Sequence, residues 1–451
     1  MTTAQPPLSL LERQQTLLKA LQSRVRMKSD LSLAGLVRYR PTMIQPLDRW
    51  FRYREAYSPQ LVDRLIFGDR RLNGRVLDPF AGSGSTLLAA QRNGAESVGF
   101  ETNPVMALLA RVKTRHFTTN ELTRVSEVCE AIRDLSPAFP PYPEPSFSLA
   151  NKFFREDVLA ALLRARAVIE SSKIEAVRDL LFMGWLCILE DVSNVYKEGN
   201  GVKYRNRKRS SKGYTVIPWD ETPGFKQDGY QLVRERLTSQ WDSMRNDLVS
   251  RGIGPEPVIH NVSALDMSSH IAQGSIAGCV FSPPYCNNFN YSKIFKTELW
   301  MGGLVENQAE MRALTQSAIR SHVEMRLTLP TEPDLPEGLS DVTTWMREGN
   351  LWHRDIPNAV TAYFLDMKEV LRQLFVCLDS GAECFIVIGN SAYGGVIVPS
   401  DLFLAQIAEE LGYSVESVTV ARHLTTSSQQ QQKLSELRDF LRESVIYLRK
   451  E

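Results

Sequence analysis

Two short segments combine residues that could bind a ligand and act on it, and each follows a short apolar run. The first is 78–86 (DPFAGSGST). The segment 75–78 (RVLD) predicts a buried strand, Gly82 and Gly84 permit a tight turn, and 86–92 predicts a helix. Glycines let a ligand approach the backbone closely, and the first turn of a helix offers free N–H donors. The segment is therefore predicted to bind a ligand.

The residues around this turn narrow the class of ligand. Leu87 stands where the dinucleotide fingerprint needs a third glycine, and no lysine follows Gly84, which disfavours a dinucleotide site and a phosphate loop. Asp78 supplies a carboxylate that suits a cationic amino-acid moiety. Glu101 ends the next predicted strand, 97–101, where an acid would reach a pair of ribose hydroxyls. The alternative is a structural turn with a serine or threonine helix cap.

The second segment is Ser282-Pro283-Pro284-Tyr285, which follows the predicted strand 276–281. Proline fixes φ and has no N–H donor, so the Pro283 carbonyl points in a fixed direction beside the Ser282 hydroxyl. Two acceptors and the Tyr285 ring suit a planar base that carries an exocyclic amine. The alternative is an ordinary Pro-Pro turn, but its pairing with the glycine turn favours a joint site.

The elements around these segments predict an α/β protein. Short apolar runs alternate with helical patterns over 57–118, which is typical of a parallel sheet with helices on both faces. A largely helical insertion over 119–255 interrupts the pattern, as does an irregular segment over 303–357. Leu237, Trp241, Met244 and Leu248 form one apolar stripe of a helix in the insertion. Further strands are predicted at 384–389, 414–420 and 444–449, with a helix at 359–378.

Composition excludes several classes of protein. The 451 residues include 43% hydrophobic and 23% charged side chains and carry a formal net charge of +1, which excludes a disordered or polyanionic chain. No run is long enough for a membrane span, and no secretory signal is apparent, so we expect a cytoplasmic protein without a membrane partner. The six cysteines form no C-x-x-C pair and the six histidines have no ligand spacing, so we expect reduced thiols and no metal.

Two segments are basic although the whole chain is nearly neutral. Residues 1–40 and 197–214 each carry seven lysines and arginines against few acids. Such segments could bind a polyanion locally, and 197–214 is expected to be a mobile loop without its partner. The alternative is a solvated surface loop and a frayed terminus.

The motifs together resemble those of DNA amino-methyltransferases, which use S-adenosylmethionine to methylate cytosine N4 or adenine N6. DPFAGSGST resembles their cofactor loop, FETNP at 100–104 their ribose-binding strand end, and SPPY their catalytic tetrapeptide. The resemblance covers about half of the chain and implies a Rossmann-like class I methyltransferase fold. Weaker resemblances, in the family's order, are found at 49–66, 264–266, 385–395 and 442–450.

The resemblance also implies roles for individual residues. The catalytic residues would be Ser282, Pro283, Pro284 and Tyr285. The cofactor-binding residues would be Tyr57, Asp78, Phe80, Ala81, Gly82, Gly84, Ser85, Thr86, Glu101, Asn103 and Asp266. From the basic segment, the expected nucleic-acid contacts are Lys203, Arg205, Arg207, Lys208, Arg209 and Lys212.

The implied reaction is methylation of a flipped base in double-stranded DNA, with S-adenosylmethionine as cofactor. Serine at the first position of the tetrapeptide favours cytosine N4, and adenine N6 is the alternative. Cys286 does not follow a proline, so it lacks the setting of a cytosine-C5 nucleophile and is expected to be a neutral wall or core residue. An RNA base methyltransferase and a non-catalytic nucleic-acid-binding subunit are further alternatives. A restriction or phage-defence partner is left open.

Four segments are therefore expected. Residues 1–44 form a basic N-terminal extension and 45–118 the cofactor half of a methyltransferase core. Residues 119–255 form the mostly helical insertion, a candidate for target recognition. Residues 256–451 form the catalytic half, with the irregular insert at 303–357.

Overall fold

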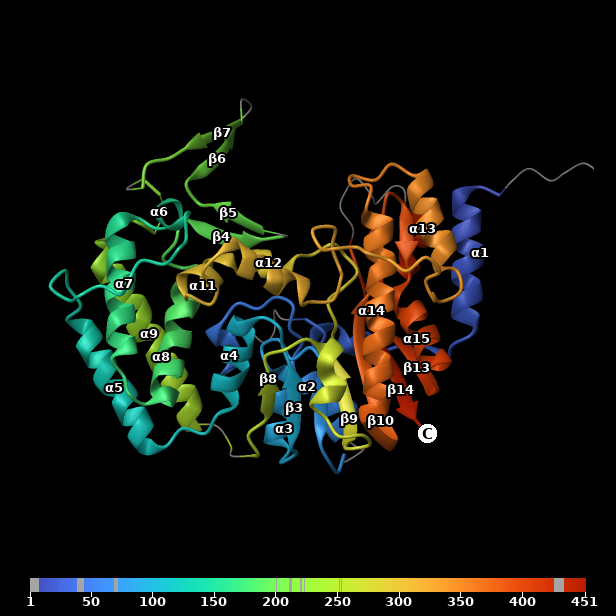
Figure 1. The fold of residues 1–451 in the computed structure, drawn as a ribbon, viewed down its shortest axis with the longest axis horizontal. Helices are drawn as coiled ribbons and strands as arrows, with labels where there is room; N and C mark the ends of the chain where they lie inside the picture. Colours follow the sequence, from blue (N-terminus) through green and yellow to red (C-terminus); the bar gives the residue numbers. More distant parts are fainter. Residues whose placement is uncertain are drawn as a thin grey trace, which may run out of the picture.

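An eight-stranded sheet forms the centre of the computed structural model (Figure 1). Its order is β1-β13-β14-β10-β9-β2-β3-β8, and only β14 runs antiparallel to its neighbours. The strands are β1 (Met27–Ser29), β2 (Val76–Asp78), β3 (Ser97–Phe100), β8 (Val258–His260), β9 (Ile276–Phe281), β10 (Leu378–Gly389), β13 (Tyr413–His423) and β14 (Arg442–Lys450). The structure describes residues 8–38, 44–68, 72–199, 201–210, 213–219, 221–222, 224–250, 252, 254–425 and 434–451.

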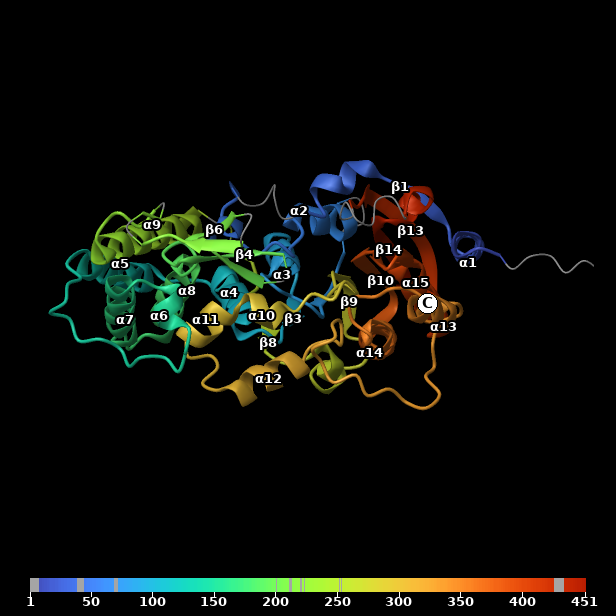
Figure 2. The same cartoon turned by 90° about the horizontal axis from the view of Figure 1, so that it is seen from above.

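Helices bury both faces of this sheet (Figure 2). Alternate residues of a strand point to opposite faces, so Leu77 joins the core beneath α14 (Ile356–Cys377) and α15 (Ser400–Glu410), while Val76 joins the core beneath α3 (Ser85–Arg92). Burial on both sides explains why the strands are nearly continuous apolar runs. The predicted α/β fold, a mostly parallel sheet with helices on both faces, is confirmed.

The chain between α4 (Pro104–Thr114) and β8 forms a second, mainly helical body, seen at the left of Figure 1. The apolar stripe predicted on α9 (Gly229–Ser250) is buried, and Gly184 lets α8 (Glu175–Ile188) approach it, because a Cβ at Gly184 would lie 2.3 Å from Trp241 Cδ1. This body shares one hydrophobic core with α4 and with α11 (Lys296–Met301), so it packs against the sheet domain. Its helices are α5 (Thr119–Arg133), α6 (Ala150–Phe153), α7 (Glu156–Glu170), α8 (Glu175–Ile188) and α9 (Gly229–Ser250).

The basic segment 197–214 is not the loop that the sequence predicted. It lies within two β-hairpins, which project from the helical body in Figure 1. Asn194 joins them to that body, since its carbonyl accepts Arg205 N at 2.7 Å and its Oδ1 accepts Asn206 N at 3.0 Å. The four strands are β4 (Val195–Glu198), β5 (Gly201–Tyr204), β6 (Arg207–Ser210) and β7 (Gly213–Val216).

Part of the segment 1–44 belongs to the sheet domain, because β1 pairs in parallel with β13 at the edge of the sheet. Helix α1 (Leu10–Ser23) packs nearby through Leu18, which shares a small core with Leu437. The segment 303–357 contains two helices. The remaining α-helices and strands are α2 (Pro59–Val62), α10 (Tyr291–Ile294), α11 (Lys296–Met301), α12 (Gln308–Gln316), α13 (Leu339–Glu348), β11 (Ser391–Tyr393) and β12 (Val396–Val398).

The helices of the described residues are unsuited to a bilayer. Each of them is too short or too polar to cross a membrane.

Candidate active site

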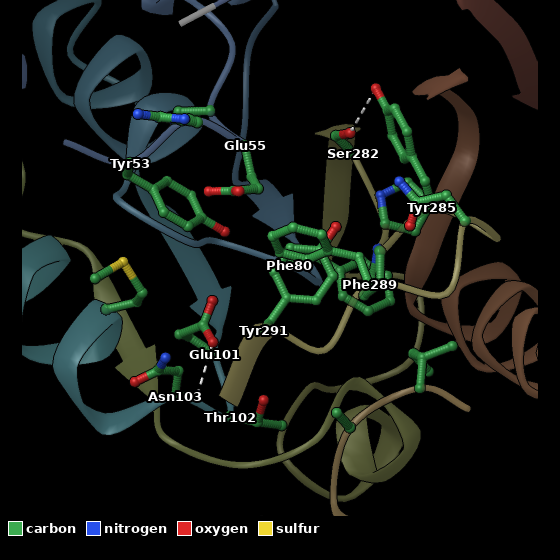
Figure 3. Close-up of a pocket in the computed structure, with 18 of the residues that line it drawn as sticks. Tyr53, Glu55, Phe80, Glu101, Thr102, Asn103, Ser282, Tyr285, Phe289 and Tyr291 are labelled. Atoms are coloured by element: carbon green, nitrogen blue, oxygen red, sulfur yellow. Dashed lines mark hydrogen bonds between the residues drawn. The ribbon is translucent and has the colours of Figure 1, made fainter. Parts of the chain in front are cut away.

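A cavity of about 1010 Å³ opens at the carboxyl ends of β2, β3, β8 and β9. Phe80 follows β2, Glu101 follows β3 and Ser282 follows β9, and all three line this one space (Figure 3). In open α/β sheets, ligands bind where the strand order reverses, at the carboxyl ends of the strands. The two segments singled out in the sequence therefore meet in a single site.

The glycine turn has the backbone that its sequence predicted. Gly82 and Gly84 have φ of +49° and +87°, and Gly84 is the residue that precedes α3. A Cβ on Gly82 would lie 2.8 Å from Cε1 of Tyr53, a cavity residue, whereas a Cβ on Gly84 would meet Ala110 of α4 at 3.2 Å. Gly82 thus shapes the cavity wall, and Gly84 serves the packing of α3 on α4.

Asp78 is 1% exposed and lies outside the cavity lining. Its Oδ1 accepts the Phe80 amide at 2.9 Å and its Oδ2 accepts the Tyr57 hydroxyl at 3.2 Å. Burial raises its pKa to about 7. Asp78 and Tyr57 therefore support the turn through these hydrogen bonds, and neither lines the cavity. Ala81, Gly82, Gly84, Ser85 and Thr86 also lie outside the lining.

Glu101 joins the ends of β2 and β3. Its Oε2 accepts the Gly82 amide at 2.9 Å and its Oε1 accepts the Asn103 amide at 2.7 Å. Burial raises the pKa of Glu101 to about 7, although both amides favour the ionised form. Asn103 in turn caps α4, since its Oδ1 accepts Val105 N at 3.0 Å. Glu101, Asn103 and Phe80 are the predicted cofactor residues that line the cavity.

After β8, the sequence predicted Asp266 as a site residue, but the structure brings Ser263 to the cavity instead. Asp266 is exposed and does not line the cavity, whereas Ser263, three residues earlier, is buried and does. The sequence prediction chose Asp266 because it is the only acidic residue in the segment 264–266. The strand β8 itself, of three residues, was not predicted, so the register of the loop after it could not be fixed.

All four residues of the tetrapeptide, Ser282 to Tyr285, line the cavity. Ser282 Oγ lies 3.5 Å from the Tyr285 hydroxyl, as the dashed line in Figure 3 marks. The Tyr285 hydroxyl donates to Glu443 Oε1, and Arg422 Nε donates to Glu443 Oε2. Burial, and then the charge of Glu443, raise the pKa of Tyr285 far above its ordinary value, so the phenol stays protonated.

Four aromatic residues, Tyr53, Phe289, Tyr291 and Phe295, complete the walls. Phe289 and Tyr291 lie edge to face with ring centroids 4.7 Å apart, and Tyr53 and Phe295 lie 6.1 Å apart. Figure 3 shows Tyr53, Phe80, Phe289 and Tyr291 around the same space. The sequence signal for these walls was the clustering of aromatic residues in two segments, one at 50–57 and the other at 289–295, shortly after SPPY. Such rings provide flat surfaces for a planar ligand.

Cys286 is 1% exposed, and burial raises the pKa of its thiol well above the ordinary range. A thiol in this state is a poor nucleophile, which agrees with its interpretation as a neutral core residue. Across the described part of the chain, no three His, Cys, Asp or Glu side chains are grouped as metal ligands are.

The hairpin residues proposed to contact nucleic acid differ in their surroundings. Arg207 and Lys208 are exposed, and Arg207 lies 4.0 Å from the centroid of the Tyr204 ring. Lys203 pairs with Glu198 at 2.8 Å. Arg205 donates to the carbonyls of Ser193 and Glu190 at 3.2 and 3.3 Å, so part of its guanidinium is used within the protein. Lys212 and the Arg209 side chain lie outside the described residues.

Comparisons with known proteins point to the family that the sequence motifs resemble. The family model described as DNA methylase, which covers N6 and N4 methyltransferases, matches residues 32–111, a range that includes β2, the glycine turn, β3 and most of α4. Type II methyltransferase M.AvaI from Nostoc sp. is 28% identical over 434 residues, which cover 89% of this chain and 87% of that protein.

Two further relatives are similar over most of their length. Type II methyltransferase M.BsoBI from Geobacillus stearothermophilus is 26% identical over 453 residues, covering 91% of this chain and 87% of the relative. Type II methyltransferase M.MvaI from Kocuria varians is 18% identical over 382 residues, with 80% of each chain covered. The family model and these relatives support the DNA amino-methyltransferase family for this chain, and the mostly parallel sheet is consistent with a Rossmann-like methyltransferase fold.

Proposed function

We propose that this methyltransferase transfers a methyl group from S-adenosylmethionine to the exocyclic amine of a flipped base in double-stranded DNA, with cytosine N4 favoured. One observation carries the proposal. The ribose-type acid Glu101 follows β3 and the tetrapeptide Ser282–Tyr285 follows β9, the two strands on either side of β2, and both line the same cavity. A cofactor and a base could therefore meet there.

The residues at the β2 and β3 end fit the cofactor. Glu101 offers carboxylate oxygens for ribose hydroxyls, Phe80 offers an aromatic face, and Ser263 offers a small polar group after β8. When bound, S-adenosylmethionine supplies an electrophilic methyl group on a sulfonium. Gly82, Asn103 and Asp78 hold this end of the site in shape through the hydrogen bonds described above.

The tetrapeptide acts on the base. The lone pair of an exocyclic amine is delocalised into the ring, which makes the nitrogen a weak nucleophile. Ser282 Oγ and the Pro283 carbonyl accept its two hydrogens and favour a tetrahedral nitrogen. The increase in reaction rate comes from the positioned hydrogen-bond acceptors, and no covalent bond forms between the base and the protein. Tyr285 and the rings of Phe289 and Tyr291 offer stacking surfaces for a base that leaves the duplex.

Serine at position 282 supports cytosine N4 as the acceptor. Adenine N6 is the second candidate, because both amines present the same two hydrogens to Ser282 and Pro283. An RNA base is disfavoured, since no added RNA-binding module is recognisable in the sequence and the relatives are Type II methyltransferases. The similarity to Type II methyltransferases supports a role in restriction-modification.

The β4–β5 and β6–β7 hairpins are proposed to contact the DNA backbone. They lie in the insertion between the cofactor half and the catalytic half, and β4 reaches the site, because Lys197 forms an ion pair with Glu298 of α11 and lies 4.6 Å from the Phe295 ring centroid. Arg207 and Lys208 are exposed on the outer hairpin, where cations could pair with phosphates.

The test uses methyl-tritiated S-adenosylmethionine and unmethylated, mixed-sequence bacteriophage DNA. The wild-type protein should transfer tritium to DNA, and Ser282→Ala should lower turnover about 10²-fold while leaving cofactor affinity nearly unchanged, because the hydroxyl acts on the base. Calorimetry with S-adenosylmethionine alone supplies the affinity. Ser282→Ala turnover equal to that of the wild type would place the chemistry elsewhere.

A further inference from the structure

The proposed function requires a group that takes up a proton, and the inference below rests on that function. As the amine nitrogen forms its bond to the methyl carbon, the methyl–sulfur bond breaks and the nitrogen gains a positive charge. One N–H proton must then leave. Neither the Ser282 hydroxyl nor the Pro283 carbonyl can keep a proton near neutral pH, so a base is needed beyond them.

The cavity lining contains the carboxylates Glu55, Glu101 and Glu443. Both oxygens of Glu101 accept backbone amides beside the glycine turn, at the cofactor end. Glu55 projects into the cavity beside Tyr53 in Figure 3. Among the described cavity residues, Glu443 is the carboxylate that is hydrogen-bonded to the catalytic tetrapeptide, through the Tyr285 hydroxyl.

The surroundings of Glu443 suit a proton acceptor. It is 2% exposed on β14 and lies directly opposite Arg422 of β13, whose Nε donates to Oε2. Oε1 faces the Tyr285 hydroxyl. On the other side, β10 places Gly389 opposite Glu443, and a Cβ on that glycine would lie 2.8 Å from Cε2 of the Tyr285 ring. The missing side chain at Gly389 thus leaves room for the Tyr285 ring beside Glu443.

We propose that Glu443 accepts the proton released by the base amine, through Ser282 and Tyr285. The amine gives its proton to Ser282 Oγ, the serine proton passes to the Tyr285 oxygen, and the tyrosine proton passes to Glu443 Oε1. Ser282 and Tyr285 end neutral, as they began, and Glu443 ends protonated until solvent reaches it. The 3.5 Å between Ser282 and Tyr285 must shorten when DNA is bound, which is common for catalytic hydrogen bonds in free enzymes.

The charges around the acceptor are compatible with this transfer. Arg422 forms an ion pair with Glu443 before the reaction. An exocyclic nitrogen that carries an extra proton is a far stronger acid than a carboxylic acid, so it can still protonate a carboxylate paired with arginine. The raised pKa of Tyr285 keeps its phenol neutral, as a group that both donates and accepts must be.

The experiment measures single-turnover methyl transfer to unmethylated bacteriophage DNA by full-length protein preloaded with tritiated S-adenosylmethionine. Glu443→Gln keeps the size of the side chain and removes its basicity, and Tyr285→Phe keeps the ring and removes the hydroxyl. Each should slow transfer about 10²-fold. The double variant should be no slower than the slower single variant, because the two groups act in series. Formate should restore part of the rate to Glu443→Ala and none to Tyr285→Phe.

The matched control is Glu383→Gln. Glu383 also accepts a tyrosine hydroxyl, from Tyr447, and also lies near an arginine, Arg449 at 3.6 Å, but it does not line the cavity. Its variant should transfer methyl groups at the wild-type rate. Cofactor affinity, measured by calorimetry, should be unchanged in every variant, which also shows that each one folds.

Three outcomes overturn the proposal. They are a Glu443→Gln rate equal to that of Glu383→Gln, rate reductions that multiply in the double variant, and a Glu443→Ala enzyme that formate does not accelerate. A wild-type protein that transfers no methyl group contradicts the proposed function instead, so the two failures are distinguishable.

Discussion

Glu101 Oε2 accepts a hydrogen bond from the backbone amide of Gly82 at 2.9 Å, which joins the end of β3 to the turn after β2. The same carboxylate accepts the Asn103 amide and lines the cavity. A single acid therefore joins the β2 and β3 ends of the cavity and also faces its interior. Its pKa of about 7 makes its charge sensitive to pH in the neutral range.

Glu101→Gln should weaken binding of S-adenosylmethionine at a pH of about 8 by about 2 kcal/mol, roughly 30-fold, because the variant has no charged acceptor. For the wild type, binding that needs the ionised carboxylate should weaken as the pH falls below about 7, by up to about tenfold per pH unit. Isothermal titration calorimetry over a pH range from about 5.5 to about 8.5 checks both expectations. An equally steep pH dependence in Glu101→Gln contradicts the assignment.

Gly82→Ala and Gly84→Ala should have different effects on binding. Both place a side chain at positive φ and should lower the free energy of unfolding by about 1–2 kcal/mol. Only the Gly82 change forces Tyr53, a cavity residue, to move, so only Gly82→Ala should also weaken cofactor binding. Denaturant unfolding and calorimetry separate the two quantities. Equal reductions of affinity would mean that Gly84 also acts at the cavity.

Much of the fold could be predicted because its signals are local. The strand 276–281 has the predicted bounds, since an apolar run ends at two prolines, and β2, β3, α3 and α4 follow from the glycine turn and its flanking runs. The three-residue strand β8 and the hairpins were not predicted. Strand β8 is too short to show an apolar pattern. The strand pattern of the hairpins was obscured by the dense positive charge of the segment 197–214.

The residues of the candidate site likewise divide into those that local sequence signals could identify and those that they could not. Ser282 and Glu101 follow strands directly and could be named from the sequence. Glu443 is 158 residues from Tyr285 and reaches it only because β14 lies beside β10 in the sheet. Ser263 has no charged group, so the sequence offered no reason to prefer it to the nearby acid Asp266. Contacts that depend on tertiary packing are therefore the ones that the sequence left unassigned.

Replacing Arg207 and Lys208 together with alanine should weaken binding to DNA of any sequence. Removing one cation–phosphate pair should flatten the dependence of log affinity on log salt by about one unit, so the double variant should flatten it by about two. Fluorescence anisotropy with labelled duplexes over a salt series measures the slope. Arg205→Ala is the comparison, because its guanidinium bonds to Ser193 and Glu190, and it should mainly lower stability. An unaltered slope in the double variant would leave these residues as a solvated surface.

The most direct test of the central claim is the chemical identity of the product. Unmethylated bacteriophage DNA is incubated with the protein and S-adenosylmethionine, digested to nucleosides and analysed by mass spectrometry. Ser282 and Pro283, as paired acceptors beside the cavity shared with Glu101, predict a methyl group on an exocyclic amine, as N4-methylcytosine. Product that contains only N6-methyladenine would reverse the choice of base, and 5-methylcytosine or unmodified DNA would contradict the account.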